Sequence, residues 1–175
     1  MYTKKDQKIY DKTKKFLENI NDTEIEEKMK KIDSVLKISD TKERYSYLFE
    51  LICDYLDNEF RKNNLCDFDN CGLCKRRRAL KEKNPNKETY LYGCCYSYIN
   101  KRVCPFLNKD GSCTNRNIGC KLFTCHYLKK EGYSFNLNDI YLSKYFFTKK
   151  EKKYLDEHIY LTKEVVMDHL MKHKK

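Results

Sequence analysis

The sequence predicts a mainly α-helical protein in which helices surround a cysteine-rich, loop-dominated insert with little β structure. Two observations predict this fold class. Apolar residues recur at helical spacing in residues 1–63 and 136–175, which indicates amphipathic helices. Nine of the ten cysteines lie in residues 64–128, where helical periodicity is poor. A chain of 175 residues is long enough for one domain with its own core, so we expect residues 1–175 to form a single domain.

The N-terminal section, residues 1–63, predicts three helices. The first covers roughly residues 4–20 by its apolar spacing. The second opens on Thr23 and Glu26, which form a capping-box pattern, and the third begins near Asp40. Cys53 flanks the apolar stripe of the third helix, and we interpret it as a small buried hydrophobe.

The C-terminal section, residues 136–175, predicts two helices. Asn138 is a candidate cap for a short helix, and Thr148 with Glu151 forms a capping box that opens a longer helix reaching His173. His169 and His173 have a metal-compatible spacing, but no third ligand accompanies them in the sequence. We therefore interpret both histidines as exposed.

The middle section has too few aliphatic residues to form a hydrophobic core alone. Its clearest pattern is an alternating run from Tyr90 to Tyr98, which predicts a short strand or hairpin. Thiolate–metal bonds are the alternative source of stability for such a segment. A tight turn such as Cys71-Gly-Leu-Cys74 brings two sulfurs within reach of one metal. The sequence therefore predicts a metal-binding segment.

The compartment supports this interpretation of the cysteines. The N-terminus shows no apolar signal region and no stretch is long enough to cross a bilayer, so we expect a cytoplasmic protein without a membrane role. Thiols stay reduced there, and clustered cysteines are more often metal ligands or redox catalysts than disulfides. In an exported protein the disulfide interpretation would return.

The net charge of +11 does not by itself identify a partner. Residues 1–63 are balanced, whereas residues 64–135 carry fourteen basic and six acidic groups. Metal-bound cysteine is a thiolate, so part of this local surplus offsets the ligands. The Arg76–Lys87 segment, with three consecutive arginines, leaves a nucleic-acid partner open without favouring it.

Spacing alone does not choose the metal. The C-x4-C-x2-C spacing from Cys66 to Cys74 is the same as that of the first three ligands in plant-type [2Fe–2S] ferredoxins. The next cysteine, Cys94, is twenty positions after Cys74. Four sulfurs in a tetrahedron suit zinc equally well. Both zinc and an iron–sulfur cluster therefore remain candidates.

The cysteine pattern resembles the YkgJ-like CxxCxxCC family of zinc- or iron-chelating domains. Four segments carry the resemblance: Cys71-Gly-Leu-Cys74, Gly93-Cys94-Cys95, Cys104-Pro-Phe-Leu-Asn-Lys-Asp-Gly-Ser-Cys113 and Cys120-Lys-Leu-Phe-Thr-Cys125. They span about a third of the chain. Two features depart from the family, namely the nineteen residues between Cys74 and Cys94 and the absence of Arg-Pro before Cys120. These departures affect the ligand assignment more than metal binding itself.

Together these observations predict a metal-binding protein whose role is structural or redox. The predicted ligands are Cys71, Cys74, Cys94, Cys95, Cys104, Cys113, Cys120 and Cys125, with Cys66 as a ninth candidate. A structural zinc site would present a surface to a protein partner. A cluster would serve electron transfer or an enzyme, and the resembled family includes a flagellin lysine methylase. A third hypothesis is a zinc scaffold that binds nucleic acid through Arg76–Lys87. No residue stands out as catalytic, so the sequence does not decide whether the protein is an enzyme.

Overall fold

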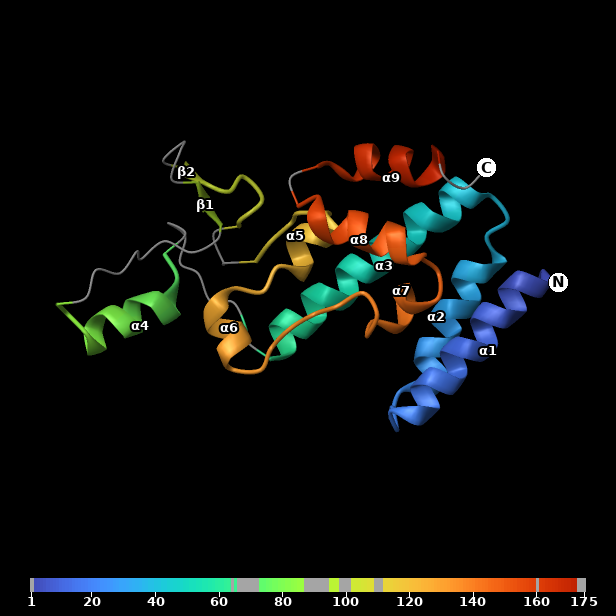
Figure 1. The fold of residues 1–175 in the computed structure, drawn as a ribbon, viewed down its shortest axis with the longest axis horizontal. Helices are drawn as coiled ribbons and strands as arrows, with labels where there is room; N and C mark the ends of the chain where they lie inside the picture. Colours follow the sequence, from blue (N-terminus) through green and yellow to red (C-terminus); the bar gives the residue numbers. More distant parts are fainter. Residues whose placement is uncertain are drawn as a thin grey trace. The chain divides into compact units, whose positions relative to one another are not determined.

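The chain divides into two compact units. Figure 1 shows that its regular structure is mostly helix. The computed structural model describes residues 2–63, 65, 73–86, 95–97, 102–108, 112–159 and 161–172. Unit 1 comprises Met1–Tyr55, Arg116–Thr124 and Tyr133–Lys175, and unit 2 comprises Leu56–Asn115 and Cys125–Gly132. The described residues are mainly helical with very little strand, which confirms the predicted fold class.

The elements follow one another in a simple order. They are α1 (Lys4–Asn19), α2 (Ile25–Lys37), α3 (Thr41–Lys62), α4 (Lys75–Lys83), β1 (Tyr96–Ser97), β2 (Arg102–Val103), α5 (Ile118–Leu122), α6 (His126–Lys130), α7 (Tyr141–Lys144), α8 (Lys149–Glu157) and α9 (Lys163–Lys172). None of the helices in the described part of the chain is both long and apolar enough to cross a membrane.

The three predicted N-terminal helices are confirmed, but the predicted cap of the second is wrong. Helix α2 begins at Ile25, and its N-cap residue Glu24 makes no side-chain capping bond. The Asp22 carboxylate accepts a hydrogen bond from the Glu24 N–H at 2.9 Å, which orders the turn before the helix. The same carboxylate binds Lys28 at 2.6 Å, which ties the turn to the helix.

Unit 1 has a continuous apolar core. Helix α1 packs against α2 and α7, and α5 packs against α8. Leu48, Phe49 and Ile52 on α3 are fully buried, and Cys53 beside them is also fully buried, as predicted. Amphipathic helices stabilise a fold chiefly by burying such faces.

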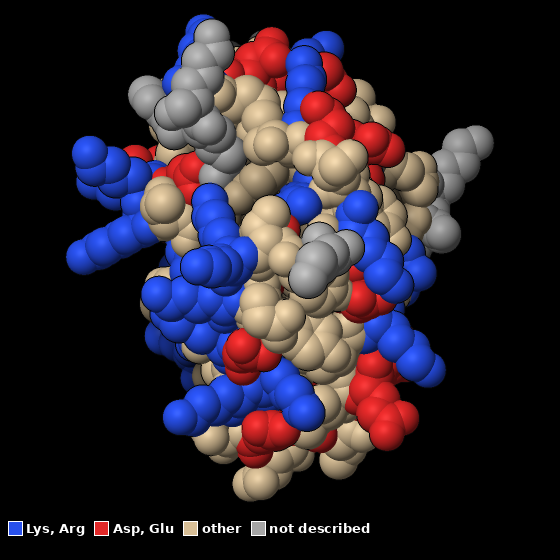
Figure 2. All heavy atoms as spheres, turned by 90° about the vertical axis from the view of Figure 1, so that its right-hand side faces the viewer, with Lys and Arg blue, Asp and Glu red and all other residues tan. Residues whose placement is uncertain are grey.

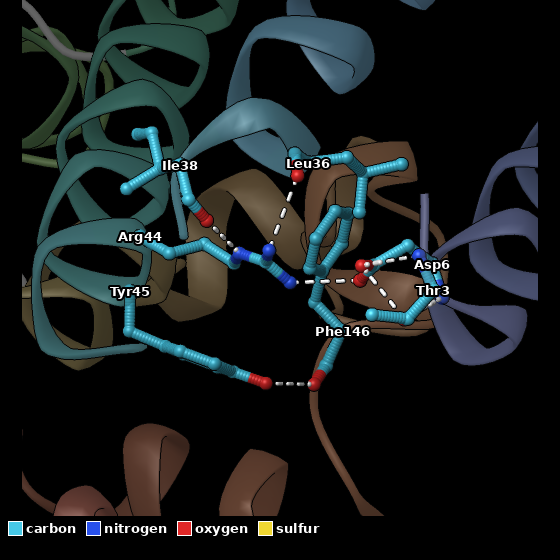
Figure 3. Close-up of polar contacts among 7 residues, drawn as sticks. All are labelled: Thr3, Asp6, Leu36, Ile38, Arg44, Tyr45 and Phe146. Atoms are coloured by element: carbon cyan, nitrogen blue, oxygen red, sulfur yellow. Dashed lines mark hydrogen bonds and ion pairs between the residues drawn. The ribbon is translucent and has the colours of Figure 1, made fainter. Parts of the chain in front are cut away.

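Arg44 joins three helices of unit 1 at the α2–α3 connection (Figure 3). Its guanidinium donates to the carbonyl oxygens of Leu36 and Ile38 at 3.1 and 2.7 Å, and to the carboxylate of Asp6 at 2.7 Å. Asp6 also completes a capping box with Thr3 at the start of α1. The buried carboxylate is therefore both a helix cap and the partner of a cation.

The outer face of unit 1 mixes both signs of charge. On the face shown in Figure 2, basic and acidic side chains lie next to each other. Helix α2 contributes two ion pairs, each between residues one helical turn apart. They are Lys31–Glu27 at 2.8 Å and Lys37–Asp33 at 2.6 Å. This agrees with the balanced charge of residues 1–63 and indicates an ordinary solvated surface.

The predicted pair of C-terminal helices is wrong in number, because the expected long helix is two helices. The capping box of Thr148 and Glu151 opens α8 as predicted, but α8 ends at Glu157 and α9 starts at Lys163. The buried amide of Asn117 accounts for the break. It donates to the backbone carbonyls of His158 at 3.1 Å and Leu161 at 2.5 Å. These carbonyls therefore have partners outside any helix.

Two further details of this section differ from the prediction or refine it. Asn138 does not cap α7, whose N-cap residue is Ile140. The Asn138 side-chain oxygen instead accepts from Lys152 at 2.9 Å. Gly119 on α5 lies so close to α8 that an added Cβ would be 2.4 Å from the Leu155 carbonyl oxygen. Only glycine fits at this contact.

Unit 2 contains α4, α6, the end of α3 and a two-stranded sheet. Strands β1 and β2 pair antiparallel, with Tyr96 opposite Val103 and Ser97 opposite Arg102. Of the predicted strand from Tyr90 to Tyr98, β1 covers Tyr96–Ser97, and residues 90–94 and 98 lie outside the described residues. The buried apolar side chains of unit 2 among the described residues are Leu56, Leu65, Cys74 and Leu128.

Candidate metal centre

Six of the nine predicted ligands are among the described residues. Cys74, Cys95, Cys104, Cys113 and Cys125 belong to unit 2, Cys120 belongs to unit 1, and Cys66, Cys71 and Cys94 lie outside the described residues. All seven described cysteines, which include Cys53, carry thiols rather than disulfides. Cys74 is buried, and the other five described candidate ligands are half-buried.

Cys95 and Cys104 are brought together by the sheet of unit 2. The backbone N–H of Cys104 donates to the Cys95 carbonyl at 2.7 Å, which adds one more pair to the β1–β2 ladder. Residues directly opposite in an antiparallel pair point their side chains to the same face, with Cβ atoms about 4.5–5.5 Å apart. Two sulfurs placed in this way can reach one metal ion at about 2.3 Å each.

Cys113 belongs to the same framework as Cys104. After Cys104 the chain turns, and the Leu107 N–H donates to the Cys104 carbonyl at 3.0 Å. Leu107 then pairs with Cys113 in an isolated antiparallel bridge, and the Thr114 N–H donates to the Phe106 carbonyl at 2.8 Å. The predicted segment from Cys104 to Cys113 thus folds back on itself, which places Cys113 opposite Leu107.

Cys74 and Cys125 occupy equivalent positions at the starts of α4 and α6. Each is the N-cap residue of its helix, and its carbonyl accepts an N–H from one turn further on, at 3.0 Å in both cases. The two helices are joined by polar contacts within unit 2. Arg76 forms an ion pair with Glu131, and the Arg77 guanidinium lies 5.6 Å from the centre of the Tyr127 ring.

These contacts bear on the predicted role of the three arginines. The guanidinium groups of Arg76 and Arg77 are engaged by α6 and its C-terminal end, so they fix α4 within unit 2. Arg78 is exposed. The part of the Arg76–Lys87 segment that faces solvent is therefore smaller than its sequence suggests.

Cys120 is the one described candidate ligand that belongs to unit 1. It lies on α5, and its N–H donates to the Asn117 side-chain oxygen at 2.8 Å. The spacing Cys120-x4-Cys125 places both residues in one motif of the sequence, and the boundary between the units falls just before Cys125. The structure thus gives Cys120 a defined place on α5.

The described residues do not contain a complete metal site. No group of three or more cysteine, histidine, aspartate or glutamate side chains is placed to hold a metal ion within the described ranges. Cys95 and Cys104 fit the chemistry as a pair of soft thiolate donors, which suits zinc or an iron–sulfur cluster. The predicted ligands Cys66, Cys71 and Cys94 lie outside the described residues.

The structure also shows clusters that the sequence did not reveal. Tyr154 stacks between two histidines, with ring centres 4.0 Å from His158 and 3.7 Å from His169. The prediction that His169 is exposed is therefore wrong, because α9 brings it half-buried against α8. His173 lies outside the described residues. Since the α8–α9 break was not predicted, no sequence signal could have placed these rings together.

A second such cluster joins α3, the segment before α5, and α9. Glu50 binds Arg116 at 2.6 Å and Lys163 at 2.5 Å, and Arg116 also reaches Asp54 at 2.9 Å. Burial acts to raise the pKa of Glu50, but hydrogen bonds from Lys163 and Arg116 outweigh it and hold this pKa below its usual value. These three segments of unit 1 are thereby tied together.

No family model, curated protein or solved structure matches this chain. The resemblance to the YkgJ-like family therefore stays a prediction based on the cysteine pattern.

Proposed function

We propose that this chain is a thiolate metal protein in which unit 2 is organised by zinc or an iron–sulfur cluster. The observation that carries the proposal is the shortage of apolar interior in unit 2. It has four buried apolar side chains among forty-five described residues, against twenty-three among one hundred and two in unit 1. A folded segment with so little core needs another source of stability, and metal–thiolate bonds supply one.

The cysteines support this proposal by their number and place. Unit 2 contains five of the described cysteines together with Cys66, Cys71 and Cys94 in the sequence. Cys95 and Cys104 lie opposite each other, which is the arrangement that gives one ion two neighbouring ligands. Zinc would serve as a structural element, and a cluster would add a redox function.

Metal analysis of protein purified without oxygen tests the proposal. We expect stoichiometric metal in one of two forms. A zinc protein should be colourless, whereas an iron–sulfur protein should be brown, contain iron and sulfide, and absorb at about 400 nm. The variant Cys104→Ser should lose metal, whereas Cys53→Ala should keep it because Cys53 is buried in the α3 core. Protein that is reduced, folded and free of both metals would refute the proposal.

A second candidate function, nucleic-acid binding, is favoured by the composition of α4. This helix carries six basic residues and one acidic residue. Since Arg76 and Arg77 contact α6 and its C-terminal end, binding would rest on the exposed Lys75, Arg78 and Lys83. Titration with labelled RNA and DNA tests it, and binding should weaken with salt and further in Arg78→Ala. Binding that is absent at low salt would exclude this function.

A further inference from the structure

The end of the sheet in unit 2 offers a redox-sensitive pair. Cys95 and Cys104 are joined by the hydrogen bond between their backbones and continue the register of Tyr96 opposite Val103. A hydrogen-bonded pair in an antiparallel ladder has Cα atoms about 5.5 Å apart, within the range of about 4.4–6.8 Å that a disulfide spans. Its Cβ atoms, about 4.5–5.5 Å apart, must approach to about 3.5–4.5 Å for the bond to form. Both side chains are half-buried thiols, so solvent reaches them in part.

We propose that Cys95 and Cys104 form a reversible disulfide when the protein meets hydrogen peroxide, and that this bond releases the metal of unit 2. The release rests on the proposed function, whereas the disulfide itself does not. The backbone already holds the two Cα atoms at a bridging separation, and the bond requires the two Cβ atoms to move towards each other.

The chemistry balances with peroxide as the oxidant. One thiolate attacks an oxygen of hydrogen peroxide, the O–O bond breaks, and the departing hydroxide takes up a proton and leaves as water. The resulting sulfenic acid is attacked by the second thiolate, which forms the S–S bond and expels the other oxygen as a second water. In total two thiols give two electrons and two protons to peroxide. A thiol reductant of the glutathione class restores both cysteines by exchange.

The other described cysteines are less suited to this reaction. Cys53 is fully buried in the core of unit 1. Cys113 lies opposite Leu107, and Cys74 and Cys125 begin separate helices. Since oxidation follows both exposure and the nearness of a second thiol, the opposed pair should react first. Loss of two thiolates at once would leave a four-coordinate metal with too few ligands to hold it.

Peptide mapping after peroxide treatment tests the proposal. Full-length protein as purified is treated with hydrogen peroxide, its remaining thiols are alkylated, and it is digested with trypsin without reduction. The two cysteines fall in different peptides, residues 88–101 and 103–109, so the expected product is that linked pair. Fragmentation must place the bond at Cys95 rather than Cys94, and a zinc- or iron-sensitive dye should report metal release in parallel.

Two variants make the result specific. Cys104→Ser should abolish the linked pair, while Cys113→Ser should keep it, because Cys113 lies opposite Leu107 rather than Cys95. The proposal is overturned if Cys95 and Cys104 remain alkylatable after peroxide, or if Cys95 is found joined to a different cysteine. Formation of the bond in a protein that contained no metal at the outset would sustain the disulfide and refute the proposed function instead.

Discussion

Units 1 and 2 belong to one chain but differ in what fills their interiors. Unit 1 buries long apolar faces, with Leu48, Phe49 and Ile52 of α3 at its centre. Among its described residues, unit 2 buries four apolar side chains, and its described contacts are mainly a short backbone ladder, an ion pair and a cation–π contact. The first arrangement is that of an ordinary helical domain.

This difference in apolar burial indicates that the two units have different sources of stability. Ordering a segment costs conformational entropy that grows with its length, and burial of apolar surface is the main term that offsets it. Among the described residues, unit 1 has twenty-three buried apolar side chains to offset this cost and unit 2 has four. Under the proposed function, metal–thiolate bonds supply the remaining stability of unit 2.

The largest expected effect is the selective unfolding of unit 2 when metal is removed. A strong chelator in reduced, oxygen-free buffer should open unit 2, while helices of unit 1 stay folded. Limited trypsin digestion followed by mass spectrometry checks this, because α4 carries several cleavage sites in its sequence. We expect rapid cleavage at Arg76, Arg77 and Arg78 only after chelation. Equal protection of these sites with and without chelator would show that unit 2 does not depend on a metal for its fold.

Truncation of a core residue in unit 1 should give the opposite pattern. Ile32 on α2 is fully buried, so Ile32→Ala should lower the free energy of unfolding by about 2–5 kcal/mol. Its metal content should equal that of the wild type, since the cavity lies in unit 1. The exposed Ile20 is the matched control, and Ile20→Ala should change stability by less than about 0.5 kcal/mol. Denaturant titration with metal analysis on the same samples gives both quantities.

A smaller effect should appear at the Asp6–Arg44 pair, and it should depend on pH. Burial acts to raise the pKa of Asp6, but hydrogen bonds from Thr3 and Arg44 outweigh it and set the pKa below its usual value. A carboxylate whose pKa is lowered by folding stabilises the protein above the unfolded pKa, near about 3.9. That stabilisation is lost as the pH falls through the lower pKa of the folded state.

The variant Asp6→Asn isolates this contribution. At pH 7 it should be less stable than the wild type by about 1.5–3 kcal/mol, the range for hydrogen bonds to a charged group. The gap should narrow as the pH falls below about 4, because the Asp6 carboxylate of the unfolded wild type then takes up a proton while that of the folded protein stays ionised. Denaturant titrations from pH 7 to pH 3 measure it, with the exposed Asp11→Asn as control. A gap that stays constant over this range would show that the charge of Asp6 does not matter.

The N-terminal helices and the start of α8 could be predicted because their signals are local. Capping at Thr148 and Glu151 and the stripes of α1 to α3 arise from residues three or four positions apart. The break between α8 and α9 could not be predicted. It depends on Asn117, which is 41 and 44 residues from the two carbonyls that it binds.

The arrangement of the candidate cysteines could not be predicted from the sequence. The alternating run from Tyr90 to Tyr98 indicated a strand, yet the pairing of Cys95 with Cys104 depends on β2, whose two residues carry no pattern of their own. Likewise the spacing of Cys120 and Cys125 cannot reveal that they belong to different units. Register and unit boundaries come from long-range contacts, which local periodicity does not encode.

The smallest expected effect concerns the ion pair between α4 and the C-terminal end of α6. Arg76 and Glu131 are 30% and 46% exposed, and such pairs contribute about 0.2–1 kcal/mol. Arg76→Ala should therefore leave metal content and the trypsin pattern of unit 2 unchanged, as should Lys83→Ala at the exposed end of the same helix. This variant decides between two accounts of unit 2. If polar contacts held the unit together, loss of Arg76 would open it as chelation does; if the metal holds it, α4 stays protected until the chelator is added.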